Sequence, residues 1–135
     1  MHKGSTVRSG HKVFVYGTLR QGCSNHRLLR HAVFLGPART ARRYSLYVDD
    51  FPYLVKAPPV SRIHGEVYVV DDQDLQRLDA LENHPFWYKR QEQTVLLLES
   101  GKKVKSWIYF FPRAKGMLVE SGDYLQSRLC CLKRE

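Results

Sequence analysis

The hydrophobic positions of this chain recur mostly at the spacing of β-strands. Short β-prone runs end at glycine, proline or acidic residues, a pattern that predicts strands separated by turns. The runs cover residues 13–16, 33–48 in two pieces broken near Gly36-Pro37, 53–56, 64–70, 88–99 and 104–111. The last two flank a short turn at residues 100–102, so we expect them to form a long hairpin. Short antiparallel strands therefore dominate the expected fold.

One stretch has a clear helical pattern and begins after Asp71, whose side chain can cap a helix from the next residue. Leu75, Leu78 and Leu81 recur at helical spacing and form an apolar stripe. Glu82 follows Leu78 by four positions, so it lies on the same stripe. We expect its carboxyl to point toward the core, although a glutamate at a helix end can also turn outward to solvent.

Many strands with two short helices, and no alternating βαβ pattern or repeat, predict an α+β domain. We expect the sheet to curl into a small mixed β-barrel with flanking short helices. The length of 135 residues suits a single domain, and the hydrophobic share of 43% can supply its core. We place that domain at residues 12–135, after a flexible basic leader at residues 1–11 that shows no periodicity.

The sequence also bears on cellular location. No segment approaches the roughly 20 apolar residues of a membrane-spanning helix, and the N-terminus lacks the apolar run of a secretory signal. Cys23, Cys130 and Cys131 form no CxxC spacing and are odd in number, so we expect reduced thiols rather than disulfides or a zinc site. These patterns predict a cytoplasmic protein without a membrane partner.

Charge is unevenly distributed along the chain. Residues 1–48 hold nine of the 22 Lys and Arg and none of the 13 Asp and Glu, so the net charge of +9 belongs to this third. Such a segment could bind nucleic acid through phosphate contacts. We favour a solvated surface with a basic leader, because no nucleic-acid-binding motif accompanies the charge. Some of these arginines could also attract an anionic substrate.

The strand at residues 13–16 leads into the sequence Tyr16-Gly17-Thr18-Leu19-Arg20. An ordinary turn in which Gly17 supplies an unusual backbone angle would account for this segment. Alternatively, successive main-chain N–H groups leaving the strand converge on a carboxylate or carbonyl oxygen, and Gly17 lets that ligand approach closely. Glu82 is the second candidate, because burial would raise the pKa of its carboxyl toward the range of a general acid or base.

Three segments together resemble the AIG2-like γ-glutamyl cyclotransferase family. They are Val13-Phe14-Val15-Tyr16-Gly17-Thr18-Leu19-Arg20, His64-Gly65-Glu66-Val67-Tyr68, and Leu78-Asp79-Ala80-Leu81-Glu82 followed by Tyr88-Lys89-Arg90. The resemblance covers roughly residues 12–125. Gly22 with Asn25-His26 is similar to the γ-glutamylamine cyclotransferase branch, whereas residues 120–125 are more similar to small bacterial AIG2-like proteins. The resemblance implies a small β-barrel whose pocket lies between the Tyr16 loop and the acidic helix end.

The resemblance also implies an activity. The α-amine of a γ-glutamyl group attacks its own γ-carbonyl, which closes 5-oxoproline and expels an amine without a cofactor or metal. Glu82 matches the catalytic acid of the family, and the implied substrate-binding residues are Tyr16, Gly17, Thr18, Leu19, Arg20 and Tyr88. The implied partner is a small γ-glutamyl compound, and nucleic acid is disfavoured. The amine that leaves and the oligomeric state stay open, as does the alternative of a binding module without turnover.

Aromatic residues near these segments have a simpler explanation. Tyr88 fits a pocket lining and an ordinary strand aromatic equally well. Trp107, Tyr109 and Phe111 recur at every second position and share one strand face, so we expect them to pack in the core.

Overall fold

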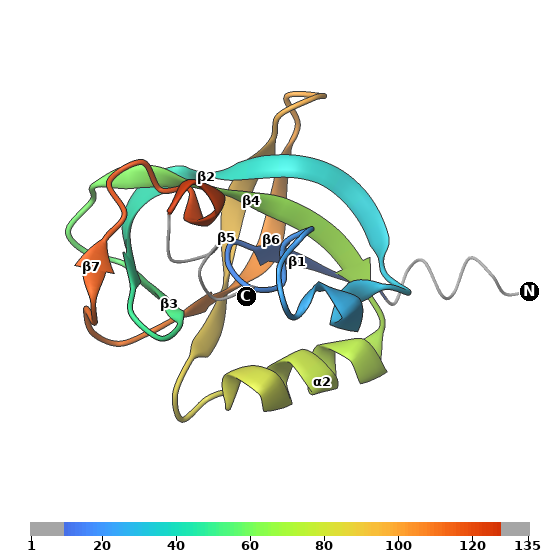
Figure 1. The fold of residues 1–135 in the computed structure, drawn as a ribbon. Helices are drawn as coiled ribbons and strands as arrows, with labels where there is room; N and C mark the ends of the chain where they lie inside the picture. Colours follow the sequence, from blue (N-terminus) through green and yellow to red (C-terminus); the bar gives the residue numbers. More distant parts are fainter. Residues whose placement is uncertain (1–9, 128–135) are drawn as a thin grey trace, which may run out of the picture.

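The computed structural model describes residues 10–127, and most of them form a β-barrel (Figure 1). The elements in chain order are β1 (His11–Val15), the 3₁₀ helix η1 (His26–Leu29), β2 (Val33–Val48), β3 (Pro52–Val55), β4 (Ser61–Val70), α2 (Asp72–Glu82), β5 (Lys89–Leu97), β6 (Lys103–Phe110), β7 (Met117–Leu118) and the 3₁₀ helix η2 (Tyr124–Gln126). The α+β class is confirmed. Most of the expected leader, and Cys130 with Cys131, lie outside the described residues.

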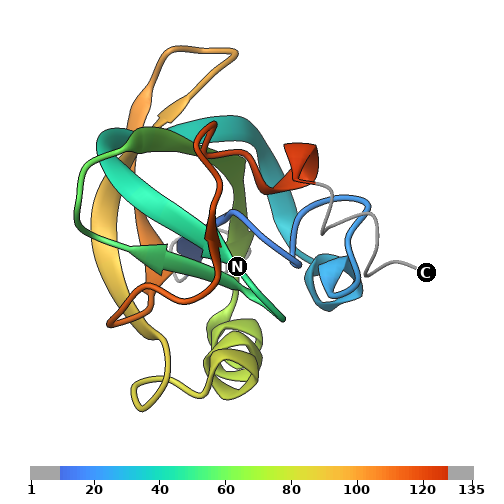
Figure 2. The same ribbon diagram turned by 60° about the vertical axis from the view of Figure 1, so that its left-hand side comes forward.

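The barrel closes because β2 pairs with strands on both sides of it. Around the ring, β2 is followed by β4, β1, β6 and β5, and β5 pairs with β2 again. β1 and β6 run parallel, with Val13 opposite Trp107, whereas β1 runs antiparallel to β4. β3 and β7 extend the sheet from β2. The mixed barrel expected from the sequence is thus confirmed, and the hairpin of β5 and β6 projects beyond it (Figures 1 and 2).

β2 differs from the prediction, which broke it into two pieces near Gly36-Pro37. The structure has one strand of 16 residues with register shifts between Phe34 and Gly36 and between Arg39 and Arg43. Gly36 has a φ of 135°, which favours glycine. The glycine therefore marks a bulge that bends a continuous strand around the barrel rather than its end.

β1 is buried on both of its faces, which explains its unbroken apolar run. Phe14 and Tyr16 pack in the cluster that fills the barrel. Val13 and Val15 pack on the other side in a cluster that includes Leu75 and Leu78 of α2. α2 therefore covers the outside of the barrel next to β1, as both views show (Figures 1 and 2). Leu19 of the loop after β1 belongs to this second cluster.

α2 begins and ends as its sequence predicts. The side chain of Asp71 accepts a hydrogen bond of 2.8 Å from the main-chain N–H of Asp74. Asn83 ends the helix in the left-handed conformation, with a φ of 53°. None of the helices in residues 10–127 combines the length and hydropathy needed to cross a membrane.

Candidate functional site

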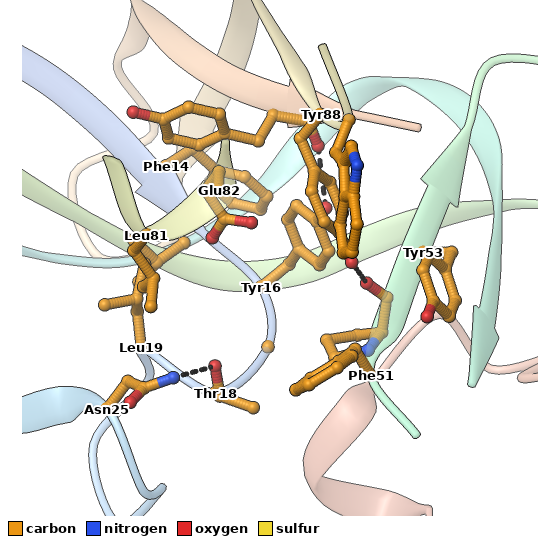
Figure 3. Close-up of a pocket in the computed structure, with 15 residues that line it drawn as sticks. Phe14, Tyr16, Thr18, Leu19, Asn25, Phe51, Tyr53, Leu81, Glu82 and Tyr88 are labelled. Carbon is orange, nitrogen blue, oxygen red and sulfur yellow. Dashed lines mark hydrogen bonds between the residues drawn. The ribbon is translucent and has the colours of Figure 1, made fainter. Parts of the chain in front are cut away.

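A cavity of about 170 Å³ lies where the loop after β1 meets the end of α2 (Figure 3). Its lining includes Tyr16, Gly17, Thr18 and Leu19 from the loop, Glu82 from the helix and Tyr88 from the segment before β5. The structure thus brings six of the seven predicted site residues into one cavity. Within the described residues that line it, Glu82 is the sole carboxylate, and there is no Lys, Arg or His.

The loop after β1 contributes residues 16–19 to the lining of this cavity. It is tightened by a hydrogen bond of 3.0 Å from the N–H of Arg20 to the carbonyl of Gly17. Asn25 donates to Thr18 twice, from its main chain to the carbonyl at 2.8 Å and from its side chain to the hydroxyl at 2.9 Å. The N–H groups of Gly17, Thr18 and Leu19 form no hydrogen bond to another described residue. They are therefore available to a carboxylate or carbonyl oxygen.

Gly17 is required for a different reason from the backbone angle considered above. Its φ lies outside the left-handed region. A Cβ at this position would lie 2.4 Å from Cγ and 3.2 Å from Cβ of Pro52. The glycine therefore allows the loop to pack directly against the start of β3.

Replacing Gly17 with alanine is expected to lower the free energy of unfolding by about 1–3 kcal/mol, the usual cost of overpacking. Pro52→Ala removes Cγ, the atom in closest contact, and should restore much of that loss in the double variant. Thr18→Ser keeps the hydroxyl that accepts from Asn25 and serves as the control. Urea unfolding of the unaltered protein and of these four variants measures the changes, and a double variant no more stable than Gly17→Ala would refute the steric explanation.

Glu82 lies at the end of α2 with its carboxyl directed between Leu81 and Tyr16, toward the loop that carries Leu19 (Figure 3). The residue is half-buried, and its carboxyl has no hydrogen-bond partner among the described residues. Desolvation raises the pKa of this carboxyl to about 7. A group with this pKa can take up and release a proton near neutral pH.

The apolar stripe of α2 is only partly buried. Leu75 and Leu78 are buried, but Leu81 is 42% exposed and lines the cavity. The helix extends beyond the core it covers, so its last turn reaches the rim of the cavity. The stripe therefore continues past the core, and its last leucine lies at the edge of the cavity.

Two buried tyrosines shape the floor of the cavity. The hydroxyl of Tyr16 donates to the carbonyl of Tyr109 at 2.7 Å, and that of Tyr88 donates to the carbonyl of Pro52 at 2.8 Å. Desolvation raises the pKa of both hydroxyls, so both stay protonated at neutral pH. The main chain of Leu54 also hydrogen-bonds the hydroxyl of Tyr16, whereas the oxygen of Tyr88 can still accept a hydrogen bond.

Tyr109 belongs to the cavity as well as to the core, a role that its strand pattern did not reveal. It is buried and lines the cavity, and its hydroxyl donates to Asp79 at 2.6 Å. Arg90 donates to both oxygens of Asp79, at 2.8 and 3.1 Å. Burial opposes ionisation of Asp79, but the hydrogen bonds from Arg90 and Tyr109 prevail and hold its pKa below the usual value. This network fixes α2 to β5 and β6 beside Glu82.

Arg20 does not line the cavity, unlike the other predicted binding residues. It is buried, and its guanidinium donates to Glu66 at 3.3 Å and to Asp123 at 2.8 Å. Glu66 also accepts from the main-chain N–H of Gln21 at 3.1 Å and from Tyr68 at 2.9 Å. The side chain of Arg20 therefore anchors the loop to β4 and to the segment before η2. The structure offers no ligand contact for it.

Other lining residues were not identified from the sequence as site residues. Asn25 was singled out only as part of the family resemblance, yet it lines the cavity and its side chain donates to the hydroxyl of Thr18. Phe51 and Trp87 line the cavity although they are 50% and 60% exposed. Both lie in short connections, where periodicity carries no information about direction. No three His, Cys, Asp or Glu side chains within residues 10–127 gather in a way that could hold a metal ion.

Comparison with known proteins agrees with this geometry. Residues 13–126 match the family model described as "Gamma-glutamyl cyclotransferase, AIG2-like". The chain is 46% identical to the "putative gamma-glutamylcyclotransferase" of Methanocaldococcus jannaschii over 86% of this chain and 97% of that protein. It is 42% identical to the human gamma-glutamylaminecyclotransferase over 64% and 63% of the two chains.

Solved structures show the same fold. An AIG2-like protein from Mus musculus superposes with a TM-score of 0.77 at 31% identity, covering 85% of this chain and 88% of that chain. An uncharacterised protein from Pyrococcus horikoshii superposes with a TM-score of 0.73 at 30% identity, covering 93% and 98%. From the family match and these relatives, the chain belongs to the AIG2-like gamma-glutamyl cyclotransferase family.

Proposed function

We propose that this protein converts a γ-glutamyl amine or γ-glutamyl amino acid into 5-oxoproline and a free amine, with Glu82 as the group that moves protons. The observation that carries the proposal is the position of Glu82. Its carboxyl has a pKa of about 7 and lies in the same cavity as the unbonded N–H groups of the loop after β1. Family membership supports the same chemistry.

The reaction requires one new carbon–nitrogen bond and the loss of another. The α-amine attacks the γ-carbonyl carbon, and the bond from that carbon to the leaving amine then breaks. The α-nitrogen gives up two protons, one before it attacks and one after the new bond has formed; the ionised Glu82 takes each in turn and passes it to the leaving nitrogen, which departs as an ammonium ion. Protons and electrons therefore balance without water, and one carboxyl performs both transfers.

Holding the substrate in a folded-back conformation is the second task of the site. The nucleophile is tethered to its target, so fixing this conformer lowers the barrier by avoiding an entropic cost. The N–H groups of Gly17, Thr18 and Leu19 suit the substrate carboxylate or the oxyanion that forms on the γ-carbonyl. The described lining includes no Lys or Arg, which supports giving this task to the main chain. The aromatic walls of Tyr16 and Tyr88 keep water away from the reacting atoms.

The proposal is tested by incubating the protein with γ-glutamyl compounds and measuring 5-oxoproline and free glutamate separately. We expect 5-oxoproline alone. Because only ionised Glu82 can accept the proton, kcat/KM should rise with pH and level off above about 7, and it should fall about tenfold per unit well below that value. Samples returned from low pH to pH 8 control for unfolding.

Two outcomes would contradict the proposal. Release of glutamate would indicate hydrolysis by an activated water. Binding of 5-oxoproline without turnover of any compound would instead favour a binding module. A cytoplasmic location is part of the same proposal and rests on the sequence.

A further inference from the structure

The mouth of the cavity carries an unusual amount of exposed apolar surface. Phe51 is 50% exposed, Leu81 42% and Trp87 60%, and all three line the cavity. We call these three side chains the apolar rim. Large apolar side chains that gather in water beside a cavity are characteristic of a ligand-binding surface. Glu82 and the loop N–H groups account for the interior of the cavity but not for this rim.

The main chain fixes the position of the rim. Phe51 lies between β2 and β3, where its carbonyl accepts from the N–H of Asp49 at 3.1 Å. Trp87 lies between α2 and β5, where its N–H donates to the carbonyl of Asn83 at 2.9 Å. The two aromatic side chains therefore approach the mouth from separate connections that are each closed by a turn. A rim built in this way is formed before a ligand arrives, which reduces the ordering cost of binding.

The orientation of the substrate follows from the proposed function, on which this inference rests. The α-amine must reach Glu82, and the α-carboxylate or γ-carbonyl must reach the N–H groups of Thr18 and Leu19. These contacts place the glutamyl part in the interior. The substituent on the leaving nitrogen then extends through the mouth, where the apolar rim is the surface available to it.

The lining of the cavity disfavours substrates whose leaving group carries a negative charge. A leaving amino acid or peptide carries a carboxylate close to the scissile nitrogen. None of the described residues that line the cavity is Lys, Arg or His, and the faces of aromatic rings are negative. The nearby ammonium of Lys115 is not part of the lining and is engaged over the ring of Tyr53, 5.3 Å from its centroid. A carboxylate at the rim would lose water without gaining a partner. An uncharged apolar substituent meets neither penalty and buries both its own surface and that of the rim.

We propose that the apolar rim is the leaving-group subsite and that it selects γ-glutamyl derivatives of uncharged arylalkyl or alkyl amines over those of amino acids. Phe51 and Trp87 are its specificity-determining residues. Leu81 completes the surface on the side of Glu82 (Figure 3).

The test compares kcat/KM for three substrates that share the glutamyl part, with 5-oxoproline as the readout. They are γ-glutamyl-phenethylamide, γ-glutamyl-ethylamide and γ-glutamyl-glycine. Burial and stacking of the phenyl ring should favour the phenethylamide over the ethylamide by about 10–100-fold. γ-Glutamyl-glycine should be the poorest of the three. A ratio of phenethylamide to ethylamide kcat/KM near one, or a higher kcat/KM for γ-glutamyl-glycine than for the amides, would overturn the inference.

Variants assign the preference to the rim. Trp87→Ala and Phe51→Ala should each lower the ratio of phenethylamide to ethylamide kcat/KM by several-fold, and the double variant should bring it close to one. Phe86→Ala is the matched control, because Phe86 neighbours Trp87 and is 82% exposed but does not line the cavity. It should leave the ratio and the rates unchanged. A ratio that survives in the double variant would place the preference elsewhere.

Failure of this inference differs from failure of the proposed function. If the unaltered protein cyclises the three substrates at equal rates, the rim does not select and the proposed function stands. If it forms no 5-oxoproline from any of them, the proposed function fails and this inference fails with it. Thermal unfolding of each variant checks that the exposed side chains were removed without loss of the fold.

Discussion

Replacement of Glu82 by glutamine is expected to lower the rate of 5-oxoproline formation by about 10²–10⁴-fold, the usual contribution of a positioned acid or base. Glutamine keeps the size and shape of the side chain but cannot accept a proton at neutral pH. The carboxyl of Glu82 has no hydrogen-bond partner among the described residues, so its replacement should not disturb the fold. Single-turnover measurement of 5-oxoproline gives the loss directly.

Glu92→Gln is the matched control, because Glu92 is exposed on β5 and does not line the cavity. Its activity should equal that of the unaltered protein. Calorimetry with 5-oxoproline should show that Glu82→Gln retains most of the binding affinity. Unchanged turnover by Glu82→Gln would assign the proton transfer to another group.

Arg20→Ala is expected to lower the free energy of unfolding by about 3–5 kcal/mol, because it leaves the buried carboxylate of Glu66 without its cation. It also removes the ion pair with Asp123, which joins the loop to the segment before η2. Urea unfolding at pH 7 measures the change. The control is Arg77→Ala, which breaks an exposed ion pair with Asp74 and should cost no more than about 1 kcal/mol.

The same variant separates two roles for Arg20. An anchoring residue should affect stability first, and the folded fraction of Arg20→Ala should still bind 5-oxoproline. If stability were unchanged while affinity fell tenfold or more, Arg20 would contact the ligand after all, and the arrangement of its guanidinium with Glu66 and Asp123 would have to change on binding.

Patterns within short segments of the sequence predicted those parts of the site that depend only on neighbouring residues. The run at residues 13–16 identified a buried strand, and the capping side chain of Asp71 fixed the start of α2, so the position of Glu82 on that helix followed. The family resemblance supplied what these patterns lacked, namely that the loop after β1 and the end of α2 share one cavity. The structure confirms that they do.

The remaining features depend on contacts between distant segments. The direction of Arg20 is set by Glu66 and Asp123, which are remote from it in sequence. Gly36 was interpreted as a break because a bulge inside a long curved strand has the same local signal as a turn. Phe51 and Trp87 belong to connections without periodicity, so their convergence at one mouth becomes visible only after the barrel has closed.

The parallel pairing of β1 with β6 also governs when the site can form. Val13 pairs with Trp107, and the hydroxyl of Tyr16 donates to the carbonyl of Tyr109, so residues at the start of the chain depend on a strand made late in synthesis. Contacts this far apart in sequence slow folding, because a long loop must close before they form. A growing chain that ends before β6 therefore contains Glu82 and the loop after β1 but lacks the strand that supports them. The protein can therefore turn over its substrate only after β6 has paired with β1 and closed the barrel.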